Sequence, residues 1–162
     1  MKRRVVITGM GVVSPLGHEI PEFLENLKKG YNGIGPMTRY DVTDRGAKLA
    51  AEVRDFDAAD YLGRREVKRM DRFTQYGVVA SMKAFEDAAL NEEIVKDNDR
   101  VAIFMSSGIG GTETLQEEII RGYTKDYDRI SPFFVPKVIS NMAAAQASIA
   151  LGIHGASMCP VS

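Results

Sequence analysis

The chain has 162 residues, of which 44% are apolar and 27% are charged, a balance that supports a packed core and argues against disorder. Its 21 basic and 22 acidic residues leave a formal net charge of -1, so no overall field favours nucleic acid or an anionic membrane. The single cysteine excludes an intramolecular disulfide and a cysteine-rich zinc site. No apolar run approaches the roughly 18 residues that a membrane helix needs. The composition therefore predicts a globular protein of a reducing compartment.

The N-terminal region begins with a predicted buried strand over residues 5–8, where β-branched residues end at Gly9. The basic start before this run resembles a signal peptide, but Thr8 interrupts it and no cleavage site follows. A helix is expected from Pro21 to Lys29, because proline is tolerated in a first turn and Gly30 supplies a stop. A further strand is expected near residues 49–53.

The most regular periodicity of the chain follows Asp71, which is a suitable N-cap for a helix reaching about Leu90. Apolar residues recur there at three- and four-residue spacing, and we expect this stripe to pack onto the sheet. The stripe consists of Phe73, Tyr76, Val79, Met82 and Phe85.

The C-terminal half is predicted to contain one strand followed by two helices. Residues 100–106 are continuously apolar at their centre, which is typical of a strand covered on both faces. Helices are expected from Thr112 to about Gly122 and over residues 141–151, the second being rich in alanine and ending at Gly152. Strands separated by helices predict an α/β fold.

Two glycine-rich segments each follow a predicted strand. The first, residues 9–14, lacks the third glycine of a dinucleotide-binding fingerprint because Ser14 stands there, so a tight turn is the better interpretation. The second, residues 106–111, could present backbone amides to an anion, but it lacks the Lys-Ser/Thr pair of a phosphate-binding loop. By itself it is interpreted as a structural turn.

The remaining candidates are a basic cluster and three isolated side chains. In a helix, Arg65, Lys68 and Arg69 would share one face, which is either a solvated surface or a docking patch for an acidic partner. Cys159 has no neighbouring base or cation and is interpreted as a packing residue. His154 has equally little support as a catalytic residue, and His18 is expected to be exposed in a turn.

Four ordered segments together resemble the β-ketoacyl synthase family of condensing enzymes, in particular the elongating enzymes of type II bacterial fatty acid synthesis. The resemblance extends over all 162 residues, and the ordered set is far more specific than any one motif. The segments are residues 3–11 with 14–17, residues 68–73, residues 107–111 and residues 130–136.

The resemblance implies a thiolase-like α/β fold. The family has two similar halves, each with a five-stranded mixed sheet, layered α-β-α-β-α and paired as homodimers. Residues 1–162 would then be the N-terminal part of one β-ketoacyl synthase domain, an incomplete first half.

The resemblance also implies a reaction in two stages. An acyl group passes from acyl carrier protein to an active-site cysteine, and malonyl-acyl carrier protein then loses carbon dioxide and attacks it, giving 3-oxoacyl-acyl carrier protein. The nucleophilic cysteine would be the second residue after Ser162, and Cys159 aligns with a non-catalytic position. Residues 155–162 are similar to the family segment that precedes this cysteine, but Ala156 stands where the family usually has proline. The 162-residue chain alone would therefore carry no catalytic residue and be inactive.

The resemblance implies binding roles for six residues. Ile109 matches a residue that lines the acyl pocket, and Phe134 matches one that reaches the partner subunit's pocket across the dimer. Basic positions facing acyl carrier protein are matched by Arg65, Lys68, Arg69 and Arg129. No metal or cofactor of its own is implied, because the carrier protein holds the phosphopantetheine thioester, and a cytoplasmic location is expected.

One alternative has the same fold without the chemistry. The non-catalytic chain-length partner subunit of polyketide synthesis replaces the nucleophile, so the second residue after Ser162 discriminates the two. Cysteine there supports the enzyme and glutamine supports the partner subunit.

Overall fold

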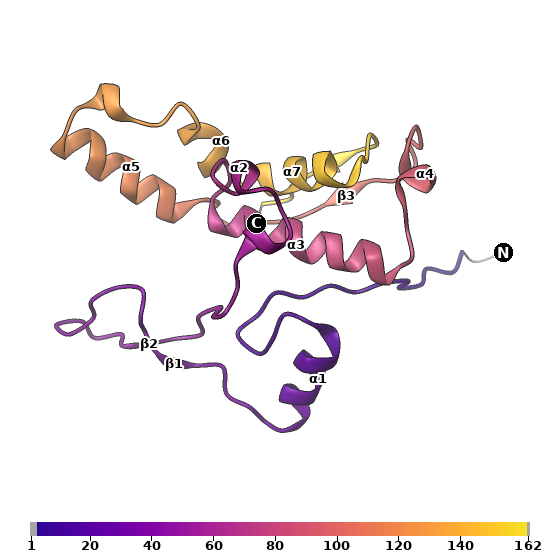
Figure 1. Ribbon diagram of the computed structural model, residues 1–162, viewed down its shortest axis with the longest axis horizontal. Coiled ribbons are helices and arrows are strands. Elements are labelled where there is room, and N and C mark those ends of the chain that lie inside the picture. Colours follow the sequence, from indigo (N-terminus) through magenta and orange to yellow (C-terminus); the bar gives the residue numbers. More distant parts are fainter. Residues whose placement is uncertain (1–2, 162) are drawn as a thin grey trace.

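The computed structural model describes residues 3–161, with three longer helices, α3, α5 and α7, on one side and a looser N-terminal part on the other (Figure 1). No helix in this part of the chain is both long and apolar enough to cross a membrane. In chain order the elements are α1 (Ile20–Lys28), β1 (Gly35–Pro36), β2 (Leu49–Ala50), the 3-10 turn η1 (Ala58–Asp60), α2 (Arg64–Val67), α3 (Arg72–Asp87), α4 (Glu92–Val95), β3 (Ile103–Phe104), α5 (Thr112–Thr124), the 3-10 turn η2 (Tyr127–Arg129), α6 (Phe134–Val138), α7 (Met142–Leu151) and β4 (Ser157–Met158).

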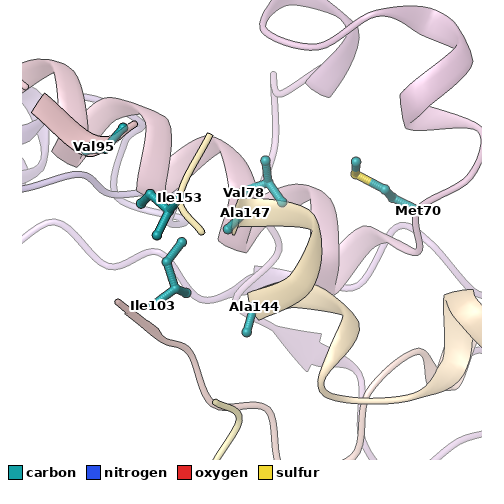
Figure 2. Packing of buried hydrophobic residues seen from close by; sticks show 7 residues of the cluster. All are labelled: Met70, Val78, Val95, Ile103, Ala144, Ala147 and Ile153. Atoms are coloured by element: carbon teal, nitrogen blue, oxygen red, sulfur yellow. The ribbon is translucent and has the colours of Figure 1, made fainter. Parts of the chain in front are cut away.

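The core lies where α3 packs against α7, and Figure 2 shows its side chains converging from these helices, β3 and neighbouring segments. Val78 and Val79 of α3 are fully buried, as is Ala147 of α7. Alanines at the contact face allow the two helix backbones to approach closely. The helix expected after Asp71 is thus confirmed, but its main packing partner is α7 rather than a sheet.

The parallel pair β3–β4 is the central sheet element of the described residues. Ile103 pairs with Ser157 and Phe104 with Met158, and α5, α6 and α7 form the crossover between the two strands. This connection confirms the α/β class. The strand expected over residues 100–106 is shorter, and its double coverage is wrong, since Ile103 is buried while Phe104 is 64% exposed.

The N-terminal segment 5–8 is extended but forms no strand within the described residues, so that prediction is wrong. Its side chains are exposed, Val5 by 96% and Ile7 by 83%. A strand needs a neighbouring backbone to satisfy its N–H and C=O groups, and no described strand pairs with this segment.

Gly9 and Gly11 pack against α3 instead of forming the expected turn. A Cβ on Gly9 would lie 2.5 Å from the Ala88 nitrogen, and one on Gly11 would lie 2.6 Å from the Ala84 nitrogen. The turn comes later, where the Ser14 and Gly17 backbones exchange two hydrogen bonds of 3.1 and 3.2 Å. Close approach to a helix, rather than chain reversal, is why glycine is required at these two positions.

The other expected elements are confirmed with small changes of boundary. The helix α1 contains proline in its first turn, and α7 ends at Gly152, whose φ of +64° is the left-handed conformation that favours glycine. The strand expected near residue 49 is the two-residue β2, which pairs antiparallel with β1.

Candidate functional site

The candidate site begins at the carboxyl end of the β3–β4 pair. The Met105 amide donates to the Met158 carbonyl oxygen at 3.1 Å, which extends the pairing by one residue. Just beyond, the Ser106 hydroxyl donates to the Pro160 carbonyl oxygen. The loop 107–111, called here the glycine loop, therefore starts beside residues 159–161.

The amides at the end of the glycine loop are already used inside the protein. The Gly110 amide donates to the Ser107 hydroxyl at 3.0 Å, and the Gly111 amide donates to the Val138 carbonyl at 2.9 Å. Gly110 has a φ of +86°, and a Cβ there would lie 3.1 Å from the Ser140 nitrogen. The structural-turn interpretation is confirmed for this end of the loop.

The buried carboxylate of Asp71 lies at the N-terminus of α5, where the unpaired backbone N–H groups of a helix favour a negative charge. Asp71 is 6% exposed, and its Oδ2 accepts from the Thr114 amide at 3.0 Å and from the Thr114 hydroxyl at 2.6 Å. Its Oδ1 accepts from the Phe73 amide at 3.2 Å and caps α3, as the sequence predicted. The contact with Thr114 is long-range and was not predicted.

The two predicted acyl-pocket residues lie in different segments of one chain. Ile109, at the middle of the glycine loop, is 76% exposed, whereas Phe134 is half-buried at the start of α6. The buried Glu118 holds the segment before Phe134, because it accepts from the Ser131 amide at 2.9 Å and pairs with Arg121 at 2.9 Å. Sequence reasoning missed this anchor, since a glutamate on a helix is usually solvated.

The predicted docking residues are all exposed. Arg65 lies in α2, Lys68 and Arg69 follow its C-terminus, and Arg129 ends η2. The Arg69 guanidinium lies over the Phe133 ring at 5.3 Å from its centroid, which links this surface to the segment before α6. None of the four forms an ion pair with another residue of the described part of the chain. Their charges therefore remain available to a partner.

A second group of charges ties residues 35–54, called here the β1–β2 arm, to the first turn of α5. Arg39 forms an ion pair with Glu113, and Arg72 lies 3.7 Å from the same carboxylate. Burial alone would lower the pKa of Arg39, but the hydrogen bond and the charge of Glu113 outweigh it and raise the pKa above its usual value. The start of α5 is thus held from two sides.

A cleft of about 430 Å³ lies between α3 and the N-terminal loop, residues 10–19, and the lysine that lines it is already paired. Lys83 bonds to Glu19 and lies 4.7 Å from the centroid of the Tyr61 ring. Burial would lower the pKa of Lys83, but Glu19 and Tyr61 together raise it. These contacts fasten the N-terminal loop to α3.

The remaining candidates from the sequence are placed as follows. His18 is half-buried, so its expected exposure is wrong: one ring nitrogen donates to the Arg54 carbonyl at 2.8 Å, and Phe56 packs against the ring. Cys159 is a half-buried free thiol, and His154 is exposed. Residues 3–161 contain no group of three His, Cys, Asp or Glu side chains arranged to hold a metal.

Comparison with known proteins agrees with this architecture. The family model "Beta-ketoacyl synthase, N-terminal domain" matches residues 2–162. The 3-oxoacyl-[acyl-carrier-protein] synthase 2 of Synechocystis is 40% identical over 163 residues, covering 99% of this chain and 38% of the relative. The chain thus spans less than half the length of this curated relative.

Two solved structures share the fold. The ishigamide ketosynthase/chain length factor superposes with a TM-score of 0.90 at 24% identity, covering 99% of this chain and 40% of that one. A type II polyketide ketosynthase, AntDE, solved in complex with its acyl-carrier protein, AntF, gives a TM-score of 0.76 at 22% identity, covering 94% and 40%. These likenesses confirm the thiolase-like α/β fold class.

Proposed function

Because the chain belongs to the β-ketoacyl synthase family, we propose that it forms the first part of a condensing enzyme that produces 3-oxoacyl-acyl carrier protein. An acyl group would pass from acyl carrier protein to a cysteine thiolate, with release of the carrier thiol. Malonyl-acyl carrier protein would then lose carbon dioxide, and the resulting carbanion equivalent would attack the acyl-cysteine thioester and expel the thiolate. The name of the Synechocystis relative supports this assignment.

The observation that carries the proposal is the shared edge of β3, β4 and the glycine loop. Residues 159–161 leave β4 where the Ser106 hydroxyl meets the Pro160 carbonyl, beside the loop that carries Ile109. A nucleophile two residues beyond Ser162 would follow directly from this edge. An acyl chain attached there would begin close to an exposed apolar side chain, as a pocket for fatty acyl groups requires.

The pocket would be completed by a second copy of the protein. Phe134 is anchored through Glu118 and Ser131 at the start of α6, away from the buried core of its own chain. We assign it to the partner subunit's pocket in a homodimer. Replacing apolar volume at Ile109 or Phe134 would then change the acyl chain length that the enzyme accepts.

The exposed basic residues would bind the carrier protein. Arg65, Lys68 and Arg69 are exposed cations close together in the sequence, and Arg129 is a fourth exposed cation on η2; none of them has an ion pair among the described residues, so on a chain of net charge -1 they can attract an acidic partner by steering its encounter. The AntDE ketosynthase, which shares this fold, was solved with its acyl-carrier protein. The carrier protein would bring the phosphopantetheine thioester, so the enzyme itself would need neither metal nor cofactor, and it would act in the cytoplasm.

The test is a search for the acyl-enzyme in the full-length protein. Incubation with acyl-acyl carrier protein without the malonyl substrate should add the mass of one acyl group, and peptide mapping should place it on a cysteine two residues after Ser162. Glutamine at that position, with no adduct, would instead identify a chain-length-factor-like subunit.

A further inference from the structure

The buried joint between Asp71 and Thr114 connects two helices that are far apart in the sequence. Asp71 precedes α3, and Thr114 is the third residue of α5. Both side chains are buried, with 6% and 7% of their surfaces exposed. One carboxylate therefore serves the N-termini of two helices, through three hydrogen bonds of 2.6 to 3.2 Å.

The helix α5 depends on this contact because it has no cap of its own. Its N-cap position is Gly111, which has no side chain to accept from the first-turn amides. Asp71 supplies the missing acceptor from another segment. The fit is close, since a Cβ on Gly111 would lie 2.9 Å from the Asp71 carboxyl carbon.

The same contact fixes the end of the glycine loop. Gly111 is both the last residue of the loop and the N-cap of α5, and its amide is held by the Val138 carbonyl at 2.9 Å. Ile109 lies only two residues earlier and is 76% exposed, so packing against its own chain does not set its position. The direction of its side chain depends on how the loop is held at its ends.

We propose that Asp71 is a positioning residue for acyl-chain selection: by capping α5 across the chain, it fixes the glycine loop and thereby the position of Ile109 in the pocket. The inference rests on the proposed function and extends it to a residue that does not touch the acyl chain. Loosening the joint lets the loop shift and alters the shape of the pocket wall. The effect falls mainly on long acyl chains, which fill the pocket most completely.

The test uses full-length protein with two substitutions of nearly unchanged volume. Asp71→Asn leaves one amide without an acceptor whichever way the new side chain is oriented, because both carboxylate oxygens accept from N–H groups. Thr114→Val removes only the hydroxyl bond. Thr114→Ser retains this bond and should restore wild-type behaviour. Thr124→Val is the matched control, since it deletes a hydroxyl bond to the Ile120 carbonyl at the other end of α5.

The expected result is a change of about tenfold in the ratio of kcat/KM for long and short acyl substrates in Asp71→Asn, and a smaller change of the same sign in Thr114→Val. Deuterium uptake in peptides covering residues 107–115 should rise in the same order. Thr114→Ser and Thr124→Val should keep the wild-type ratio.

Two outcomes separate this inference from the function on which it rests. An unchanged ratio in Asp71→Asn and Thr114→Val, while Ile109→Phe shifts it, would overturn the role of Asp71 and reduce the joint to a stability contact. An unchanged ratio in all three variants would overturn the assignment of the acyl pocket together with this inference.

Discussion

The helix pair α3–α7 and the exposed segments around it contain apolar residues of the same kinds in opposite surroundings. Val78 and Ala147 are fully buried between the helices, whereas Val5 is 96% exposed and Ile109 is 76% exposed. Their hydrophobicity does not distinguish them. The difference lies in what packs against them. The helices α3 and α7 bury each other's apolar side chains, whereas the described residues do not cover Val5 or Ile109 in this way.

This contrast separates the residues that stabilise the fold from the residues that are available to bind a partner. Close packing belongs to the helix pair, and the buried Asp71–Thr114 joint connects the start of α3 to α5 and the glycine loop, where we propose that it affects both. The exposed segments hold Ile109 and the four basic residues, of which Arg69 also packs on the Phe133 ring. We therefore expect substitutions in the helix pair to act on folding and substitutions in the exposed segments to act on binding.

The largest effect should come from a charge placed in the helix pair. Val78→Asp buries an unpaired carboxylate and should lower the free energy of unfolding by on the order of 4 kcal/mol, while Val5→Asp, on an exposed side chain, should stay within about 0.5 kcal/mol. Urea denaturation of the 162-residue chain measures both. Equal losses would show that the N-terminal segment is packed, and the contrast would be wrong.

The next effect concerns Ile109, where the contrast predicts a change in specificity with little change in stability. Ile109→Phe in the full-length protein fills pocket volume and should favour shorter acyl chains by about tenfold or more in relative kcat/KM. The melting temperature should remain close to that of wild type, because the side chain is exposed. Competition between acyl-carrier substrates of different length measures the shift, and an unchanged profile would contradict the pocket assignment.

A smaller effect is expected from the basic residues, since docking charges act on encounter rather than chemistry. The double variant Lys68→Glu, Arg69→Glu should raise KM for carrier-bound substrate about tenfold and weaken its dependence on salt, with kcat for a small thioester unchanged. Lys96→Glu, Arg100→Glu is the matched charge reversal in another segment, because both side chains are exposed and have no ion pair among the described residues. Similar losses with both substrates would assign these two residues to the fold.

The smallest effect is a pH dependence of stability from the β1–β2 arm. Hydrogen bonds from the Thr38 amide and hydroxyl, at 2.9 and 2.7 Å, lower the pKa of Glu52 below its usual value of about 4.5. Because the folded pKa is the lower one, this stabilisation is complete above pH 4.5 or so and disappears as the pH falls through the folded pKa.

The difference in unfolding free energy between wild type and Glu52→Gln should therefore shrink on going from pH 7 to pH 3. The exposed substitution Glu117→Gln on α5 is the control. A difference that is independent of pH would show that these hydrogen bonds do not stabilise the ionised carboxylate.

Local sequence signals predicted the four longer helices, α1, α3, α5 and α7, because caps and periodicity act over a few residues, but they did not predict the short helices α4 and α6. Asp71 and Gly152 were recognised as a cap and a stop, and both have these roles in the structure. The α/β class followed from the same alternation of elements.

Long-range contacts were beyond the reach of the sequence patterns. Nothing local shows that Asp71 also caps α5, that Glu118 accepts from Ser131, or that Gly9 packs against α3. The strand expected over residues 5–8 was wrong for a related reason. Composition indicates a preference for burial, but pairing requires a neighbouring strand that the described residues do not provide.

The most direct test of the proposed function is the condensation itself. Full-length protein supplied with acyl- and malonyl-acyl carrier protein should form 3-oxoacyl-acyl carrier protein and release an equimolar amount of carbon dioxide, while the 162-residue chain should form neither. Folded full-length protein that loads no acyl group and releases no carbon dioxide, or product formation by the 162-residue chain alone, would contradict the account.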